Sequence, residues 1–283
     1  MVGGRRMKKV FFFCFILLFI YLFYSNWQIN VTKYEIHSDQ IPTSFKGFKI
    51  AQVSDLHNRD FGKENNRLIK KIHAQNPDIV VLTGDMVSTT DTDFTPFYDF
   101  VSEVANNYPT YYIVGNHEQA LEEHKLKEIE QFLDANGVIR LDNEVVTLED
   151  GADKIYVYGM WFHLMYYKNA KDDSIHFGVE QMNKIISPPK DGFAIGLIHN
   201  PVYFHTYADW GMDLVLSGHM HGGIINVPFK GGLLSPEIEF FPTFDAGYFS
   251  YKDSQMIISR GLGDSISIPR LFNMPELVMI ELK

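Results

Sequence analysis

Short apolar runs in this sequence repeatedly end in residues of the types that bind metal ions. Five such runs are followed by Asp55-Leu56-His57, Gly84-Asp85, Asn116-His117, His199 and His219-Met220-His221. In α/β sheets, ligands bind where strands end, so the five exits are expected to converge on one crevice. Asp55 and His57 are two residues apart, and in extended backbone that spacing points both side chains to the same side. His219 and His221 repeat the spacing.

The donor atoms of this set indicate which metals would bind. Carboxylates, imidazoles and the amide oxygen of Asn116 give mixed nitrogen and oxygen ligation, which suits Mn, Fe or Zn better than Mg. Each motif alone is common by chance, and their conjunction at strand ends favours a metal centre. Glycines at 84, 115, 218, 222 and 223 allow sharp exits and close backbone approach. The remaining histidines lie off the motifs and are not expected to be ligands: His37, His73, His124, His163, His176 and His205.

The elements that must position these residues form an alternating pattern. Short apolar runs predict buried strands at 50–53, 79–82, 111–114, 195–198 and 214–216, and further strands at 154–158 and 256–259. Leu68, Ile69 and Ile72 share one face of a helix that stops before Pro77. A second helix, through Leu126 and Leu133, ends at 137. The order predicts one α/β domain with a mixed sheet, or two packed sheets, flanked by helices.

Composition excludes several classes of protein. With 283 residues, 46% of them apolar, the chain can bury one sizeable core. The net charge of −10 leaves no basic field for a nucleic-acid backbone, so no nucleic-acid partner is expected. The single cysteine, Cys14, rules out an internal disulfide.

The N-terminus predicts a membrane anchor. Basic residues at 5, 6, 8 and 9 precede an unbroken apolar run over residues 10–24, which is shorter than the roughly 20 residues of a typical spanning helix. No small-residue cleavage site follows, and Trp27 suits the outer interface. We expect a single-pass cell-membrane protein with a cytoplasmic N-terminus and an extracellular catalytic domain. A cleaved signal peptide is the alternative, and a twin-arginine export signal is a weaker one.

The chain therefore divides into three parts. Residues 1–28 are the basic stub and transmembrane anchor, and 47–283 the catalytic domain. Residues 29–46 are a lead-in linker or strand, in which Val31, Tyr34 and Ile36 alternate. Fully extended, the lead-in could reach about 60 Å.

The motif series resembles the calcineurin-like metallophosphoesterase superfamily. The segments 54–62, 77–85 and 259–276 are similar, more narrowly, to the bacterial membrane-associated branch of the YkuE and YaeI type. The resemblance covers residues 47–283 and implies an α/β/β/α fold of two sheets flanked by helices.

The resemblance also implies a site with two metal ions. Asp55, His57 and His221 would hold the first ion, and Asn116, His199 and His219 the second. Asp85 would bridge both. A hydroxide shared by the metals would attack phosphorus in line with the leaving oxygen. His117 would touch the substrate and stabilise charge or protonate the leaving group.

One position departs from the family pattern. The phosphatase branch has an Asp where this chain has Ser88, and an Arg is missing where residues 89 and 90 are Thr. How His117 is oriented is therefore open, and a protein-phosphatase role is in doubt. Asn58, Arg59 and Arg270 could contact a phosphate, with solvated loop positions as the alternative.

The function that these residues predict is hydrolysis of phosphate esters, with phosphodiesters or pyrophosphates of envelope lipids as the preferred class. Some relatives cleave the pyrophosphate of a UDP-diacylglucosamine lipid precursor, a cytosolic reaction that conflicts with an exported domain. The alternatives are a phosphodiesterase or nucleotidase for soluble or cell-wall substrates and a non-catalytic metal-binding scaffold. The aromatic stretches at 161–167 and 240–249 are expected to be core plus a covering loop, with membrane contact as the alternative.

Overall fold

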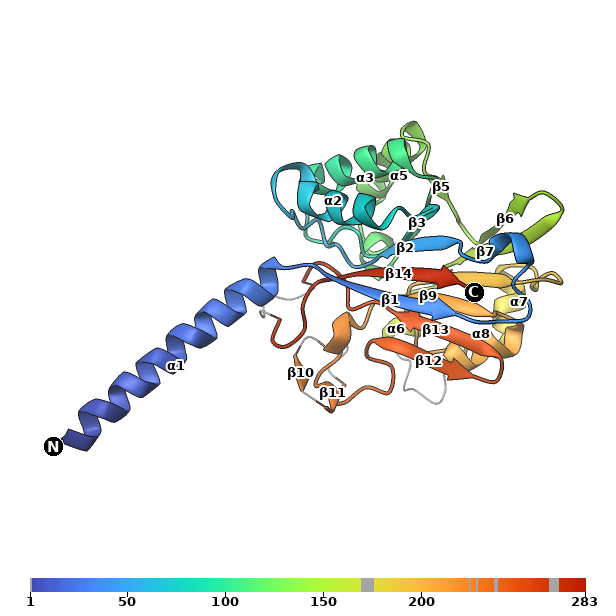
Figure 1. Ribbon diagram of the computed structural model, residues 1–283. Coiled ribbons are helices and arrows are strands. Elements are labelled where there is room, and N and C mark those ends of the chain that lie inside the picture. Colours follow the sequence, from blue (N-terminus) through green and yellow to red (C-terminus); the bar gives the residue numbers. More distant parts are fainter. Residues whose placement is uncertain (1, 169–175, 224, 228, 237–238, 265–269) are drawn as a thin grey trace.

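Two six-stranded sheets packed face to face form the body of the protein (Figure 1). The computed structural model describes residues 2–168, 176–223, 225–227, 229–236, 239–264 and 270–283. The first sheet has the order β1 (Asn30–Ile36), β14 (Glu276–Leu282), β2 (Lys49–Val53), β3 (Ile79–Thr83), β4 (Thr110–Ile113) and β5 (Ile139–Arg140). β2 to β5 are parallel, and β14 runs antiparallel to β2.

The second sheet is also mixed. Its order is β12 (Gly247–Tyr251), β13 (Ser254–Ile258), β9 (Leu214–Ser217), β8 (Ala194–Ile198), β7 (Asp153–Met160) and β6 (Glu144–Asp150). The four inner strands are parallel, and the two edge strands pair antiparallel with them. A separate short hairpin joins β10 (Asn226–Val227) to β11 (Gly231–Gly232).

Helices cover the outer faces of both sheets, so the prediction of two packed sheets flanked by helices is confirmed. The longer helices of the body are α2 (Asn66–Gln75), α3 (Thr95–Asn107) and α5 (Glu123–Ala135), and the shorter ones are α4 (Asn116–Gln119), α6 (Met165–Lys168), α7 (Val179–Ile185) and α8 (Phe204–Trp210). Single turns of 3-10 helix are η1 (Thr43–Phe45), η2 (Lys63–Asn65) and η3 (His221–Gly223).

Three apolar layers hold this arrangement together. Leu68 and Ile72 of α2 pack with Phe97 of α3 against the outer face of the first sheet. Side chains such as Ile50 and Leu216 fill the space between the sheets. A third layer lies between the second sheet and α7 and α8. β3 and β8 are continuous apolar runs because both faces of each strand are buried, one against the other sheet and one against helices.

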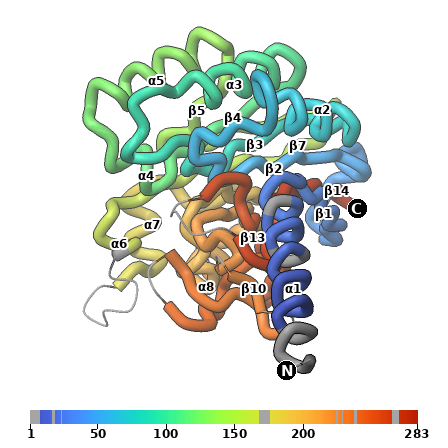
Figure 2. The backbone as a smooth tube through the Cα atoms, turned by 90° about the vertical axis from the view of Figure 1, so that its left-hand side faces the viewer, coloured from blue at the N-terminus to red at the C-terminus, as the bar shows by residue number. Residues whose placement is uncertain are grey.

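The N-terminal helix α1 (Val2–Trp27) projects away from the body (Figures 1 and 2). Its segment Lys8–Trp27 is long and apolar enough to cross a membrane, and only 7% of its most apolar window is buried in protein. A core helix of a soluble protein would be mostly buried. β1 begins just after α1 and pairs in parallel with β14 from Asn30↔Glu276 to Ile36↔Leu282. Part of the lead-in is therefore a strand of the first sheet.

Candidate metal centre

The candidate ligands converge through sharp turns at the strand ends. Asp55 and His57 have φ values of 49° and 47°, and His219 and His221 have 71° and 50°. These residues are left-handed rather than extended, so the explanation from alternating side chains in extended backbone is wrong. Asp85 also has a positive φ, of 52°. Residues other than glycine seldom adopt this conformation, and they concentrate at functional sites when they do.

Two glycines allow the turns to lie against the carboxylates. A Cβ on Gly115 would collide with Asp85 Oδ1, and a Cβ on Gly218 would collide with Asp55 Oδ2. Neither glycine has a positive φ. Each is needed because the backbone there lies too close to a carboxylate to leave room for a Cβ. Any larger residue at either position would displace a carboxylate of the site.

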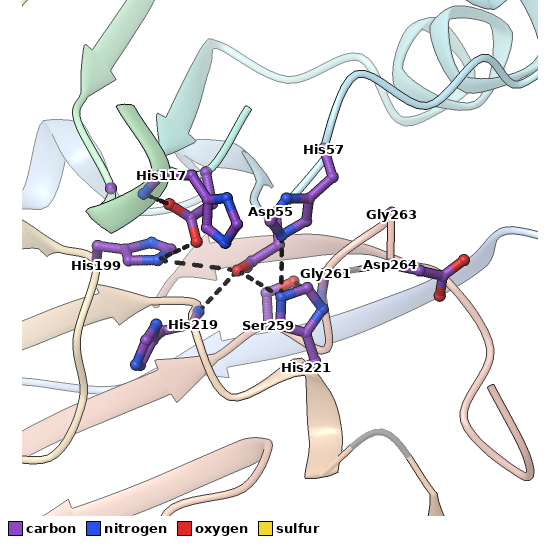
Figure 3. Close-up of polar contacts among 12 residues, drawn as sticks. Asp55, His57, His117, His199, His219, His221, Ser259, Gly261, Gly263 and Asp264 are labelled. Carbon is purple, nitrogen blue, oxygen red and sulfur yellow. Dashed lines mark hydrogen bonds and ion pairs between the residues drawn. The ribbon is translucent and has the colours of Figure 1, made fainter. Parts of the chain in front are cut away.

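The side chains form two triads that touch each other (Figure 3). Asp55, His57 and His221 make the first triad, and Asp85, His199 and His219 make the second; in each, one ligand atom per residue lies within 4.8 Å of the others. In the first, His221 Nε2 lies 3.4 Å from Asp55 Oδ1 and 3.1 Å from His57 Nε2. In the second, His199 Nε2 lies 3.1 Å from Asp85 Oδ2. A contact of 3.9 Å between His199 Nε2 and Asp55 Oδ1 joins the two.

The chemistry of this cluster fits a pair of metal ions. Asp55 and Asp85 are 0% and 1% exposed, and buried carboxylates are stable only beside positive charge. Asp55 Oδ2 and Asn116 Oδ1 are buried without a hydrogen-bond partner, so each has an unused lone pair. Asn116 Oδ1 is thus available as a ligand atom, and its place in the metal site stays a prediction from the sequence. The triads contain none of the histidines that lie off the motifs, within the described residues.

Outer contacts turn two imidazoles toward the centre. His199 Nδ1 donates to the carbonyl of Thr83 at 2.7 Å, and His57 Nδ1 lies 3.0 Å from Ser88 Oγ. In both rings Nε2 is left facing the cluster. Contacts of this kind orient metal-binding histidines and fix their tautomer. The sequence did not reveal these partners, although it marked Ser88 as a departure from the family.

The electrostatics of His57 and His221 agree with metal binding. Burial lowers the pKa of His57 to about 3. Burial, followed by the neighbouring His57 and Arg270, lowers the pKa of His221 well below its ordinary value. Both rings are therefore neutral at physiological pH, the form in which imidazole binds a metal. Burial also opposes charging of His199, but Asp85 and Asp55 outweigh it and raise the pKa of His199 to about 10.

His117 lies at the edge of the cluster and has a partner of its own. The backbone N–H of Thr89 donates to His117 Nδ1 at 3.2 Å, and Thr89 Oγ1 lies 3.1 Å from the same atom. Thr89 therefore orients the ring in this chain. A neutral ring that accepts at Nδ1 carries its proton on Nε2. His117 is also near enough to His57 and Asp85 to complete a metal-binding group, so its geometry allows either role.

Glu118 belongs to the motif that carries Asn116 and His117, but the sequence did not reveal its contacts. Its carboxylate is 0% exposed and accepts the backbone N–H groups of Asp85, Met86, Val87 and Gly115. Burial and the charge of Asp85 raise the pKa of Glu118 to about 7, while the N–H groups favour its ionised form. Glu118 thereby connects the loop after β3, which carries Asp85, to the loop after β4.

The three candidate phosphate contacts have other partners in the structure. The Asn58 side chain bonds to Asp93 O and to the N–H of Phe97. Arg59 pairs with Asp264 at 2.9 Å. Arg270 is 1% exposed and bonds to Asp264, to backbone carbonyls and to His221 Nδ1. The geometry thus gives Arg270 a positioning contact with a candidate ligand.

The C-terminal tail supports the first triad. Leu262 and Gly263 donate their backbone N–H groups to the carbonyl of Asp55, and a Cβ on Gly261 would crowd the Asp55 side chain. Figure 3 shows this segment next to Asp55. Within the family-like stretch 259–276, residues 265–269 lie outside the described part of the chain.

The aromatic stretch at 161–167 is part core and part exposed, as expected for core plus a covering loop. Phe162 and Tyr167 are 2% and 5% exposed and pack in the third apolar layer. The Tyr167 ring lies 5.1 Å from that of His219. The stretch at 240–249 differs, because Phe240 and Phe241 are 67% and 52% exposed.

Residues 48–223 match the family model described as calcineurin-like phosphoesterase. The chain belongs to the calcineurin-like phosphoesterase family. It is a metallophosphoesterase, a hydrolase of phosphate esters with a dimetal centre of transition metals formed from clustered Asp and His side chains. The sequence-based assignment to this superfamily is confirmed.

Curated relatives confirm the branch. The chain is 28% identical over 263 residues to the metallophosphoesterase YkuE of Bacillus subtilis, covering 90% of this chain and 86% of YkuE. It is 27% identical over 243 residues to the phosphodiesterase YaeI of Escherichia coli, covering 83% of this chain and 82% of YaeI. Among solved structures, the phosphopantetheinyl hydrolase PptH of Mycobacterium tuberculosis matches with a TM-score of 0.45 at 11% identity, over 76% of this chain and 89% of PptH.

Proposed function

We propose that this protein is a membrane-anchored phosphodiesterase or pyrophosphatase of envelope lipids. In the proposed site, Asp55, His57 and His221 hold one metal ion, and Asn116, His199 and His219 hold the other. The observation that carries the proposal is the pair of touching triads, with buried unpartnered oxygens on Asp55 and Asn116. Asp85 is the shared ligand, since it belongs to the second triad and also groups with His57 of the first.

The metal pair, when bound, supplies Lewis acidity to the phosphoryl oxygens and lowers the pKa of water. The protein holds the ligands in position. Ser88 and Thr83 orient His57 and His199, and Glu118 fixes the loop of Asp85. His117 points Nε2–H away from Thr89, and we assign that proton to the leaving oxygen of the substrate. A buried set of groups that is already oriented costs no reorganisation during the reaction.

The anchor and topology are part of the proposal. α1 has the length and apolar surface of a spanning helix, and the basic residues Lys8 and Lys9 precede its apolar part. Positive charge favours the cytoplasmic side, so the body would lie outside the cytoplasmic membrane. Protease added to cells stripped of their wall should then digest the catalytic domain. A protected domain would reverse the topology and favour a cytosolic lipid precursor as substrate.

The substrate class follows from anchoring. A spanning helix confines the site to a thin layer near the bilayer, which raises the local concentration of membrane-embedded esters but not of soluble ones. The name of the YaeI relative, a phosphodiesterase, supports diesters over monoesters. The second candidate is a phosphodiesterase or nucleotidase of soluble substrates, since the metal cluster itself requires no lipid. A non-catalytic scaffold is disfavoured because every candidate ligand is present.

The deciding experiment is a substrate screen. The purified full chain in detergent is assayed with soluble mono- and diesters and with phospholipids and lipid pyrophosphates, with Mn, Fe or Zn added separately. We expect metal-dependent hydrolysis, with diesters or pyrophosphates preferred and lipid substrates favoured in bilayers. An Asp85→Asn protein serves as the control for contaminating hydrolases. Preference for soluble esters in both detergent and bilayers would favour the second candidate.

A further inference from the structure

Four phenylalanines of the catalytic domain are exposed beyond what packing explains. Phe229 is fully exposed, and Phe240, Phe241 and Phe272 are 67%, 52% and 52% exposed. Among the described residues after α1, these are all the phenylalanines so exposed. Single exposed apolar residues are ordinary, but a group of large ones marks an interaction surface.

The four residues belong to one connected unit beside the metal centre. Phe229 lies in the turn of the β10–β11 hairpin, which follows η3 and its candidate ligand His221. Phe240 pairs with Leu234, just after that hairpin. Leu271, the neighbour of Phe272, pairs with Ile225, just before it. We call residues 225–227, 229–236, 239–241 and 270–272 the aromatic rim.

The aromatic rim lies on the side of the body from which α1 leaves. Figure 1 shows β10 on the same side of the body as the junction with α1, although apart from the helix itself. Hydrogen bonds fix the relation: Arg270 N donates to Asn26 Oδ1 at 3.1 Å, and Arg67 donates to Trp27 O at 2.6 Å. Arg59 also donates to Asn26 O. The end of α1 is therefore bound to the body and not loosely tethered.

One contact sets the depth of the rim. The ring of Phe272 lies 5.1 Å from the ring of Tyr21, inside the apolar part of α1. Tyr21 precedes Trp27 by six residues, or about 9 Å along a helix axis. If Trp27 is at the outer interface, Phe272 can reach Tyr21 only by entering the bilayer. Interfacial elements typically bury their apolar side chains about 5–10 Å deep.

We propose that the aromatic rim inserts into the interfacial layer of the bilayer that α1 spans, and holds the mouth of the metal centre at the level of the lipid headgroups. The partner is the lipid surface itself. Lys230, exposed next to Phe229, is placed to meet headgroup phosphates. The proposal rests on the anchoring proposed above and adds a fixed orientation to it. It also gives the substrate phosphate a position, because lipid phosphates lie in that layer.

Site-directed spin labelling tests the insertion directly. Cys14 is the only cysteine, so Cys14→Ser gives a clean background in the full chain. Single cysteines replace Phe229 or Phe241 and are labelled with a nitroxide in nanodiscs of phosphatidylcholine and phosphatidylglycerol. Ile139→Cys is the matched control, because Ile139 is 38% exposed on β5, at the opposite edge of the sheet from β1. Oxygen concentrates in the bilayer, whereas a charged nickel chelate is excluded from it.

We expect labels at 229 and 241 to relax with oxygen several times more than with the nickel chelate, and the label at 139 to do the reverse. Labels at 229 and 241 that behave like the label at 139 would overturn the proposal. Activity is a separate measurement. Phe229→Ser with Phe241→Ser should reduce hydrolysis of a bilayer phosphodiester about tenfold and leave a soluble chromogenic diester unchanged. If the labels lie in the membrane but the protein hydrolyses no ester, the proposed function is wrong and the insertion still holds.

Discussion

Replacing Glu118 by glutamine should test how far one buried carboxylate holds the site together. Oε2 accepts the N–H groups of Asp85 and Gly115 at 2.9 and 2.8 Å, and Oε1 accepts those of Met86 and Val87 at 2.6 and 3.3 Å. Glutamine has only one carbonyl oxygen. Its NH₂ group must therefore face one of these two pairs of N–H donors.

The size of the effect follows from this count. Two buried N–H groups lose their acceptor, and each such loss costs about 1–3 kcal/mol, so Glu118→Gln should destabilise the fold by roughly 2–6 kcal/mol. The variant should also bind less metal, because Asp85 and the residue before Asn116 are the donors to Oε2.

Denaturation in urea, followed by tryptophan fluorescence of the detergent-solubilised chain, measures the free energy of unfolding. Glu122→Gln is the matched control, because Glu122 is 69% exposed and forms only surface ion pairs. That change should stay within about 0.5 kcal/mol of the original protein. A Glu118→Gln protein as stable as the control would refute the reasoning, since the N–H groups would then not depend on the carboxylate.

The other predictions concern the metal centre. Asp85→Asn should lower metal content and hydrolysis together, by at least about tenfold; two metals per chain with full turnover would remove its bridging role. His117→Ala should keep the metal content and slow turnover by about 100- to 10,000-fold, most for poor leaving groups. Loss of metal in that protein would make His117 a ligand. Thr89→Val removes one contact of about 1 kcal/mol, or about fivefold in turnover, with metal content unchanged; an unchanged rate would exclude orientation by Oγ1.

Local pattern was enough to predict the strands that carry the site. The apolar runs expected at 79–82 and 195–198 are β3 and β8, which lie in different sheets and are buried on both faces. Such strands are continuous apolar runs because neither face meets water. The helix through Leu68 and Ile72 likewise follows from its spacing and is α2. Each of these features is encoded within a few neighbouring residues.

The contacts around the ligands could not be read from the sequence, because they join distant segments. Thr89 orients His117 from 28 positions away, and Arg270 reaches His221 across 49. Arg270 illustrates the difficulty: an arginine near a candidate metal site suggests a phosphate contact, but here it is buried. The left-handed turns at the ligands could not be predicted from the sequence for another reason. A positive φ at Asp55 or His221 is imposed by tertiary contacts against local preference.

The connection between α1 and the body bears on which phosphates the enzyme would reach under the proposed anchoring. A free lead-in of residues 29–46 would let the domain swing tens of ångströms from the membrane. Instead α1 ends at Trp27, β1 begins at Asn30, and β1 pairs along its length with β14. Arg270, a few residues before β14, bonds both to Asn26 at the end of α1 and to His221 at the metal centre. A single residue, through its backbone N–H and its side chain, thus links the end of α1 to the metal centre. If α1 spans a bilayer as proposed, this rigid link would hold the site near the headgroups and would favour phosphates held in the bilayer over phosphates on soluble molecules.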